Sequence, residues 1–499
     1  MTYVPNNPAA ARFAFDNTYA RELEGFYVTW KATQVARPRL VKLNRELAEE
    51  LGWDAGALDS EKGARIFAGN EIPNGAVPLA QAYAGHQFGG FVPQLGDGRA
   101  LLLGEVIDRN GRRRDIQLKG SGPTPFSRAG DGRAALGPVL REYLIGEAMH
   151  ALGIPTTRAL AAVLTGEPVF REEGPLPGAV LTRVAASHVR VGTFQFFATR
   201  GEQAKVRRLA DYVIDRHYPE LKDHANPYLG LLERMCDRQA ALIASWMHVG
   251  FIHGVMNTDN MAISGETIDY GPCAFMDHYD PATVFSSIDT QGRYAYANQP
   301  RIAQWNLARF AETLLPLIDA DEKRAIARAT EVVNAFPEQY ERYWLKGMRA
   351  KLGLVSEEEA DLNLATGFLN AMDGKNVDYT LAFRYLADAA LSQEEPIRAL
   401  FADSSAYDLW SGHWRARLAR EAVAPLARAQ AMRRANPAFI PRNHRVEEAL
   451  SAAVEREDYA PFATLLNILS RPFDDQPEFA AFAEPAPEGR GCYRTFCGT

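Results

Sequence analysis

A long apolar helical pattern that runs directly into a polar loop constrains this chain more than any other feature of its sequence. Apolar side chains recur at steps of three and four residues at Leu229, Leu232, Cys236, Ala240, Ile243 and Met247. This spacing is typical of a helix with a buried face. The helix continues without a break into the sequence HVGFIHGVMNTDN, which ends at Asn260. A buried helix that is followed directly by a loop of polar side chains able to bind a metal predicts a functional site at the end of that helix.

The polar loop is followed by two short runs, MAIS and ETID, on either side of Gly265. We expect these runs to form a tight hairpin, which would bring Asn260 and Asp269 to the same end of its two strands. An amide oxygen and a carboxylate oxygen at one strand end suit Mg²⁺, which keeps further positions for phosphates and water. The alternative is that both are ordinary residues at the edge of a turn.

The polar loop is similar to the catalytic loop of protein kinases, H-R-D-x-x-x-x-N, in which the Asp accepts the proton of the substrate hydroxyl. His253 and Asn260 fall in register with this pattern, but Val255 stands at the Asp position. Asp259 could accept a hydroxyl proton instead, or help to hold a metal. A solvated loop carboxylate is the alternative for Asp259, and we expect a structural role for His253.

Upstream of the polar loop, one lysine lies at the end of a predicted strand and one glutamate lies on the helix predicted after it. Asn110 and Gly111 separate the runs RALLLGEVID and RRDIQLKG, which predicts a hairpin with a two-residue turn whose second strand ends at Lys119. The next apolar pattern is helical, stops at Gly153 and carries Glu142 near its start. Kinases pair a phosphate-binding strand lysine with a helix glutamate in this order. A lysine and a glutamate at this separation are also common by chance.

Two glycine-rich stretches on either side of Lys119 could hold an anion through backbone N–H groups. The first is QLGDGRA, with Gly96, Gly98 and Arg99, and the second is KGSGPTPFSRAGDGRAALG. Neither matches the P-loop pattern, which disfavours a Walker-type nucleotidase. The alternative is that both are turns without a ligand.

Arg183 and Arg190 lie seven residues apart, at the end of a second group of strand-like runs, RALAAVLTGEPVFRE and GAVLTRVA. If the stretch between them is helical, the two guanidinium groups share a face about 10 Å apart, a span suited to a polyphosphate. Two arginines on a solvated helix face are the alternative.

The composition is that of a globular chain without a general nucleic-acid or membrane partner. The chain has 499 residues, 47% of them apolar, and a net charge of −7 from 55 basic and 62 acidic residues. This balance argues against a nucleic-acid binder, and no apolar run approaches the roughly 18 residues of a membrane span. The first residues resemble neither a secretory leader nor an organelle transit peptide. Four cysteines form no disulfide framework, so we expect a reducing compartment and a cytoplasmic location.

The order of these features predicts the fold. The features follow one another in the order found in kinase-like folds. This order is a strand-rich part with glycine loops, a strand lysine, a helix glutamate, a buried helix and a polar loop. We therefore predict an α+β, protein-kinase-like bilobal fold. We assign residues 1–90 to an N-terminal extension, 91–200 to a nucleotide-binding lobe, 201–480 to a helical lobe with extensions, and 481–499 to an irregular tail.

The chain resembles the selenoprotein O family of protein nucleotidyltransferases, first described as pseudokinases. The resemblance rests on four long sequence stretches that occur in the same order. They are YAGHQFGGFVPQLGDGRA, QLKGSGPTPFSRAGDGRAALGPVLREYL, VLTRVAASHVRVGTFQFF and GFIHGVMNTDNMAISGETIDYGPCAFMD. Cys497, third from the C-terminus, stands where eukaryotic members of that family carry selenocysteine. This association suggests a redox role for Cys497 and Cys492, and a free, inert tail is the alternative.

The resemblance implies transfer of AMP from ATP to Ser, Thr or Tyr hydroxyls of other proteins, with release of pyrophosphate and with ATP inverted relative to protein kinases. The cofactor it implies is Mg²⁺, with Mn²⁺ as an alternative. The positions that match nucleotide-binding residues are Gly96, Gly98, Arg99, Lys119, Asp131, Gly132, Arg183, Arg190 and Asp269. The other matches are Glu142 for the partner of the lysine, Asp259 for the proton acceptor, and Asn260 and Asp269 for the metal ligands.

Two other functions stay open at this point. The first is a γ-phosphotransferase, which the valine at position 255 argues against. The second is a non-catalytic, nucleotide-binding pseudokinase that acts as a scaffold. The complete set of Lys119, Asp259, Asn260 and Asp269 argues against the scaffold, because a scaffold needs neither two metal ligands nor a nearby carboxylate.

Overall fold

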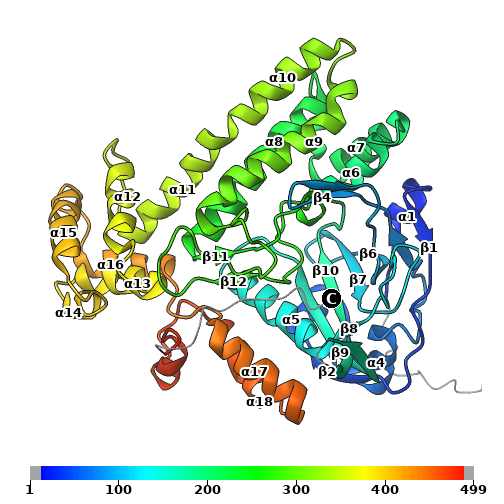
Figure 1. The fold of residues 1–499 in the computed structure, drawn as a ribbon, viewed down its shortest axis with the longest axis horizontal. Helices are drawn as coiled ribbons and strands as arrows, with labels where there is room; N and C mark the ends of the chain where they lie inside the picture. The colour runs from blue at the N-terminus through cyan, green and yellow to red at the C-terminus, as the bar shows by residue number, and fades with distance from the viewer. Residues whose placement is uncertain (1–12, 173, 488–499) are drawn as a thin grey trace, which may run out of the picture.

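The computed structural model describes residues 13–172 and 174–487, so that Cys492 and Cys497 lie outside the described residues. Figure 1 shows a sheet-rich N-terminal part, coloured blue to cyan, beside a largely helical remainder. The predicted α+β class is therefore confirmed. Within the described ranges, no helix is long and apolar enough to cross a membrane.

The N-terminal part is built on an antiparallel sheet, which has eight strands among the described residues. In sheet order they are β1 (Tyr27–Thr29), β3 (Leu79–Gln81), β6 (Ala100–Ile107), β7 (Arg113–Lys119), β10 (Gly174–Ala185), β9 (Arg158–Arg171) and β2 (Arg39–Leu43), and β8 (Ala134–Ala135) pairs with β10. On the central strands β7 and β10, Gln117 is paired with Arg183. Because side chains alternate along a strand, Gln117, Lys119 and Arg183 share one face of the sheet.

The two faces of the sheet pack against different helices. One face packs on α5 (Leu136–Ala151), whose buried side chains belong to the main hydrophobic core. The other face is covered by the short helices α2 (Arg45–Glu50), α3 (Ala55–Leu58) and α4 (Glu61–Phe67). Lys119 and Arg183 point to the α5 side, because both contact Glu142 of that helix.

The predicted hairpin and the helix that follows it are confirmed. β6 pairs with β7, although the loop between them is longer than the expected two residues. The Asp108 side chain shapes this loop by accepting hydrogen bonds from the backbone N–H groups of Asn110 and Arg112, at 2.9 Å and 2.8 Å. α5 ends before Gly153, as its sequence pattern predicts.

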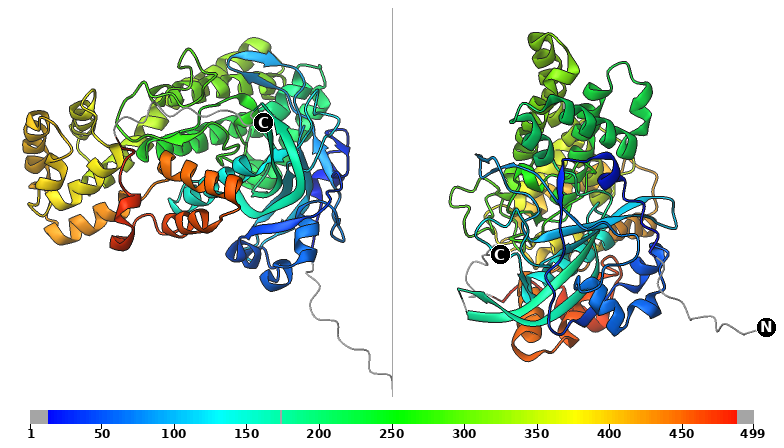
Figure 2. Two further views of the ribbon diagram at one scale, coloured as in Figure 1. Left: turned by 60° about the horizontal axis from the view of Figure 1, so that its bottom comes forward. Right: turned by 90° about the vertical axis from the view of Figure 1, so that its right-hand side faces the viewer.

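The helical part begins with α6 (Val191–Ala198), α7 (Gln203–His217) and the long buried helix α8 (Pro227–His248), which confirms the helix predicted before the polar loop. The next helices are α9 (Gln299–Ile318), α10 (Glu322–Asn334), α11 (Phe336–Leu352), α12 (Asp361–Met372), α13 (Tyr379–Ala389), α14 (Glu395–Arg398), α15 (Ser405–Leu418) and α16 (Pro425–Ala435). The chain then returns to the sheet-rich part, where α17 (Asn443–Arg456) and α18 (Ala460–Leu469) pack on α5. Figure 2 shows these two helices in orange.

The hairpin predicted after the polar loop does not form. A turn is present at Gly265, but Ala262 on one side of it is bridged to Arg190 and Thr267 on the other side to Thr156. Each run therefore pairs with the sheet-rich part instead of with the other run. This pairing ties the polar loop to the sheet-rich part and brings Arg190 beside it.

Two small sheets frame the polar loop. At its base, β11 (Phe251–Ile252) pairs with β12 (Ala274–Phe275). From the N-terminal part, β4 (Gly85–Gln87) and β5 (Gly90–Val92) form a hairpin, and β4 packs on the short 3-10 turn Thr258–Asn260. The loop is thus held between segments that are far apart in the sequence.

Candidate active site

A cavity of about 610 Å³ lies between the glycine loops, the sheet face that carries Lys119 and the polar loop. The predicted site residues that line it are Gly96, Gly98, Arg99, Lys119, Asp131, Gly132, Arg183, Arg190, Asp259, Asn260 and Asp269. Glu142 lies behind the wall of the cavity and contacts Lys119. The fold therefore brings together all the predicted site residues that lie within the described ranges.

An ionic network forms one wall of the cavity. The Nζ atom of Lys119 lies 2.5 Å from Oε2 of Glu142 and 2.6 Å from Oδ1 of Asp269. The Nη2 atom of Arg183 lies 2.5 Å from Oε1 of Glu142 and 2.8 Å from Oδ1 of Asp269. Each carboxylate thus binds both cations through charge-assisted hydrogen bonds, which restrain the positions of all four side chains.

The stretch between Arg183 and Arg190 is not a helix, because Arg183 lies on β10 and Arg190 immediately precedes α6. Arg190 nevertheless joins the network, with its Nη1 atom 3.5 Å from Oδ2 of Asp269. The same atom donates a hydrogen bond to the backbone carbonyl of Asp259 at 3.0 Å. The guanidinium group also lies over the ring of Tyr83, 4.5 Å from its centroid, a cation–π geometry.

Asp269 is the carboxylate that all three cations share. Burial alone would raise its pKa, but Lys119, Arg183 and Arg190 outweigh burial and hold the pKa of Asp269 well below its usual range. Its φ of 67° is uncommon for a residue other than glycine, and such conformations occur where the surroundings enforce them. The network thus keeps Asp269 ionised in the conformation that brings it to the cavity.

Asp259 is a buried carboxyl with one unpartnered oxygen among the described residues. Its Oδ2 accepts a hydrogen bond from Nε2 of Gln87 at 3.2 Å, whereas its Oδ1 has no partner in the described part of the chain. Burial raises the pKa of Asp259 to about 6, even though Arg190 opposes the shift. A carboxylate with this pKa is mostly ionised at neutral pH and is a stronger base than an exposed aspartate.

The hairpin of β4 and β5 holds the polar loop from the N-terminal side. The backbone N–H of His86 donates to Oγ1 of Thr258 at 2.7 Å, and the backbone N–H of Phe88 donates to Oδ1 of Asn257 at 3.2 Å. Together with the side chain of Gln87, these contacts set the position of the loop at the point where Asp259 enters the cavity.

Asn260 is oriented by the loop itself, because its Nδ2 donates to the backbone carbonyl of Val255 at 3.0 Å. The amide oxygen can act as a hard ligand, and the carboxylate of Asp269 lines the same cavity. An amide oxygen and an ionised carboxylate are a donor set that fits a divalent cation such as Mg²⁺.

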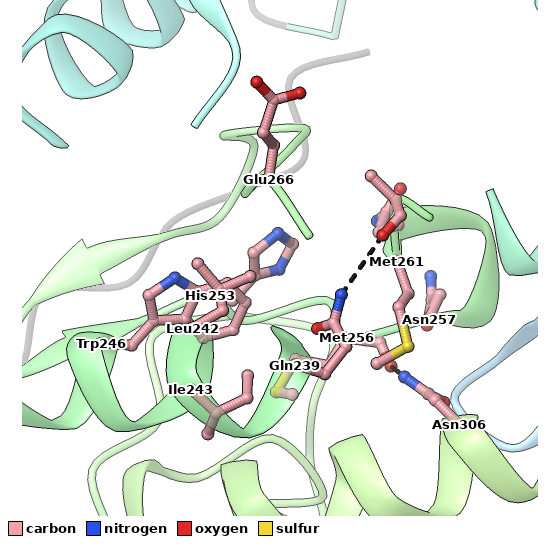
Figure 3. Close-up of a pocket in the computed structure, with 12 residues that line it drawn as sticks. Gln239, Leu242, Ile243, Trp246, His253, Met256, Asn257, Met261, Glu266 and Asn306 are labelled. Carbon is pink, nitrogen blue, oxygen red and sulfur yellow. Dashed lines mark hydrogen bonds between the residues drawn. The ribbon is translucent and has the colours of Figure 1, made fainter. Parts of the chain in front are cut away.

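The other side of the polar loop is closely packed. Figure 3 shows a small cavity lined by residues of α8, α9 and the loop, with the His253 and Trp246 rings side by side. These rings stack with centroids 5.4 Å apart, and Nε2 of His253 lies 2.8 Å from the carbonyl oxygen of Ile268. The cavity measures about 10 Å³, which leaves room for one water molecule at most. His253 therefore packs and positions the loop, and this small cavity has no room for a substrate.

The two glycine loops form another wall of the large cavity. A Cβ atom on Gly96 would lie 2.4 Å from the ring of Phe126, and one on Gly132 would lie 2.3 Å from a facing backbone carbonyl. Side chains at these positions would therefore push the loops apart. Asp131 in the second loop is held by an ion pair of 2.8 Å with Arg171 of β9, which connects the loop to the sheet.

Several polar residues of the cavity were not predicted as site residues from the sequence, among them Tyr83, Gln87, Asp97 and Asn257. Asp97 had a recognisable signal, because it is the acidic residue inside a glycine loop assigned to anion binding. Tyr83 and Gln87 come from the segment that the sequence assigned to an N-terminal extension, and no local pattern marks them as site residues.

Comparisons with known proteins agree on the class of this chain. A protein nucleotidyltransferase YdiU from Rhizobium rhizogenes is 63% identical over 487 residues, which are 97% of this chain and 97% of its own. Another YdiU, from Cereibacter sphaeroides, is 64% identical over 488 residues, 98% of this chain and 100% of its own. These relatives show that the chain is an enzyme of the class that transfers nucleotides to proteins.

The family follows from a match to most of the chain. A family model described as protein adenylyltransferase SelO matches residues 10–470. The chain belongs to this family, which confirms the resemblance drawn from the four sequence stretches.

Proposed function

We propose that the enzyme transfers AMP from ATP to a Ser, Thr or Tyr hydroxyl of a substrate protein and releases pyrophosphate. One observation carries this proposal: the cationic side chains of Lys119, Arg183 and Arg190 line the same cavity as the carboxylate of Asp259, whose Oδ1 has no partner among residues 13–172 and 174–487. The cations suit a polyphosphate, and the unpartnered carboxylate oxygen suits the proton of a hydroxyl group.

The nucleotide is held by the cations and by the glycine loops. Lys119, Arg183 and Arg190 bind the phosphates, and each charge-assisted contact contributes about 1.5–3 kcal/mol. The remaining proposed contacts are Gly96, Gly98, Arg99, Asp131, Gly132 and Asp269. Glu142 acts as a positioning residue, because it restrains Lys119 and Arg183 from behind the cavity wall.

We further propose that the fold is protein-kinase-like and bilobal, and that the nucleotide lies inverted relative to protein kinases. Family membership and the order of Lys119, Glu142 and the polar loop support this. In the inverted arrangement the α-phosphorus faces the acceptor hydroxyl, and the leaving group is pyrophosphate. Val255 stands at the position where kinases carry their catalytic base, and it is an apolar part of the cavity wall. Asp259 performs the function of that base in this enzyme.

Mg²⁺ is the cofactor that we propose, with Mn²⁺ as an alternative, and Asn260 and Asp269 would hold it. When bound, the cation would neutralise phosphate charge and orient the phosphates. Asp269 is suited to this role because its lowered pKa keeps it ionised, so that it need not lose a proton before it binds a cation.

In the transfer step, Asp259 accepts the proton of the acceptor hydroxyl while the hydroxyl oxygen attacks the α-phosphorus. A phosphoester bond forms between that oxygen and AMP. The bond between the α-phosphorus and the bridging oxygen breaks, and its electron pair leaves with pyrophosphate. Lys119, Arg183 and Arg190 stabilise the negative charge that develops on pyrophosphate.

Paired labelling tests the proposal. The protein is incubated with Mg²⁺ and either α-³²P-ATP or γ-³²P-ATP, beside the Asp269→Ala variant. We expect label only from the α-position, and none with the variant. Label from the γ-position would identify a phosphotransferase instead, and no label from either position on the enzyme or on added proteins would favour the non-catalytic scaffold.

Partners and location stay predictions. We propose substrate proteins with accessible hydroxyl side chains, a cytoplasmic location, and neither a nucleic-acid nor a membrane partner. The net charge of −7 supports the absence of a nucleic-acid partner, and the two free, buried thiols of Cys236 and Cys273 support a reducing compartment.

A further inference from the structure

Asp97 is a buried carboxyl in the cavity wall that the proposed mechanism does not use. It lies between Gly96 and Gly98 of the first glycine loop and is only 1% exposed. Its Oδ2 accepts hydrogen bonds from the backbone N–H of Gln81 at 3.1 Å and from Nε2 of Gln117 at 3.4 Å. Its Oδ1 has no hydrogen-bond partner in the parts of the chain that the structure describes.

The surroundings of Asp97 include two of the cations that are proposed to bind the phosphates. Among the charged and titratable groups that interact with it electrostatically are Arg183, Arg190, Asp269, Tyr19 and Tyr83. Gln117 connects it to the cation network, because the amide that donates to Asp97 also accepts a hydrogen bond from Nη1 of Arg183 at 3.4 Å. Within the described residues, however, no salt bridge neutralises Asp97.

An ionised Asp97 would repel the ligand that this cavity is proposed to bind. The triphosphate is a polyanion, and like charges oppose each other strongly where water is excluded. Burial already raises the pKa of Asp97 to about 6, although Arg190 and Arg183 act in the opposite direction. A bound polyphosphate raises this pKa further, so that the carboxyl carries a proton at neutral pH in the complex.

We propose that Asp97 binds the nucleotide as a neutral carboxylic acid, with a hydrogen bond from its Oδ1 to an oxygen of the phosphate chain. This inference rests on the proposed function, because it assumes that Lys119, Arg183 and Arg190 hold the phosphates. One proton enters the site from solvent as the nucleotide binds, and it stays on Asp97 during the transfer step. Asp97 thus adds a donor to the phosphate site without adding a charge.

Two variants and two ligands test the inference. Asp97→Asn keeps a neutral hydrogen-bond donor of similar size, and Asp97→Ala removes the donor. Binding of Mg²⁺-ATP and of Mg²⁺-tripolyphosphate is measured by titration calorimetry in buffers of different ionisation enthalpy, which gives the number of protons taken up. All variants carry Asp259→Asn, because Asp259 also titrates near pH 6.

We expect Asp97 to take up about 0.9 proton per ligand at pH 7 relative to Asp97→Asn, because a carboxyl with a pKa of about 6 is about nine-tenths ionised at that pH. The affinity of the protein with Asp97 should fall up to about tenfold per pH unit above pH 6, relative to Asp97→Asn. Asp97→Ala should weaken binding about tenfold at pH 6, and Asp97→Asn should bind at least as tightly as Asp97 at pH 7.

Three results would overturn the inference. Equal proton uptake with and without Asp97 would mean that Asp97 does not change its protonation state. A loss of affinity in Asp97→Asn as large as in Asp97→Ala would mean that an ionised carboxylate binds the ligand. Proton uptake with ATP but not with tripolyphosphate would place Asp97 at the nucleoside. The labelling experiment fails or succeeds independently, because γ-label combined with normal proton uptake would refute only the proposed function.

Discussion

Gly85 provides a direct test of the role of Asp259, because it lies where strand β4 approaches that carboxyl. A Cβ atom at Gly85 would lie 2.3 Å from Oδ1 of Asp259, the oxygen proposed to accept the hydroxyl proton. The backbone of Gly85 lies outside the left-handed region, so alanine can adopt its conformation. The variant Gly85→Ala therefore perturbs the proposed base without changing its chemistry.

The size of the effect follows from this contact. Ordinary van der Waals contact begins near 3.4 Å, so the Asp259 carboxyl or the hairpin must move by roughly 1 Å. A displacement of this size in a catalytic group costs about 10²-fold in rate, or about 2.7 kcal/mol in activation free energy. The cations that hold ATP belong to other elements, so the Kd for ATP should change by less than about threefold.

The assay combines the rate of α-³²P incorporation at saturating ATP with the Kd for ATP and a thermal melt. Gly90→Ala is the matched control, because it lies on the same hairpin and its Cβ would meet its nearest neighbour at an ordinary 3.6 Å. An incorporation rate within about twofold of the wild type in Gly85→Ala would refute the reasoning. So would an equal loss of rate in Gly90→Ala.

Two further predictions concern the carboxylates of the site. Asp259→Asn should lower the incorporation rate about 10²–10⁴-fold with little change in the Kd for ATP. Burial raises the pKa of Asp259 to about 6, so the wild-type rate at saturating ATP should rise with pH through about 6, and a flat profile between pH 5 and 7 would contradict its role as the base. Glu142→Gln should destabilise the protein by about 3–5 kcal/mol in urea unfolding, because it leaves Lys119 and Arg183 with one fewer buried partner. Glu457→Gln, which removes an exposed ion pair, should cost less than about 1 kcal/mol, and equal effects of the two variants would show that the buried network adds nothing.

Several elements that carry the site could be predicted because their pattern is local. Apolar residues at a regular spacing indicate the buried face of a strand or helix. Such a spacing is present in the strand that ends at Lys119, in the helix of Glu142 and in the helix before the polar loop. The sequence stretches around these elements were long enough to indicate the SelO family. Local patterns failed where a distant segment competes for the backbone. The runs beside Gly265, for example, pair with the sheet-rich part instead of with each other.

The sequence by itself determined which chemical groups this protein has, on which elements most of them lie, and to which family it belongs. Only the tertiary structure decided how these groups meet. Gln87 donates to Asp259 across 172 positions, and Lys119 reaches Asp269 across 150. The burial that raises the pKa of Asp97 and Asp259 also comes from distant segments. Such contacts result from the packing of surfaces across the whole fold, and that packing leaves no period in the local sequence from which they could be predicted.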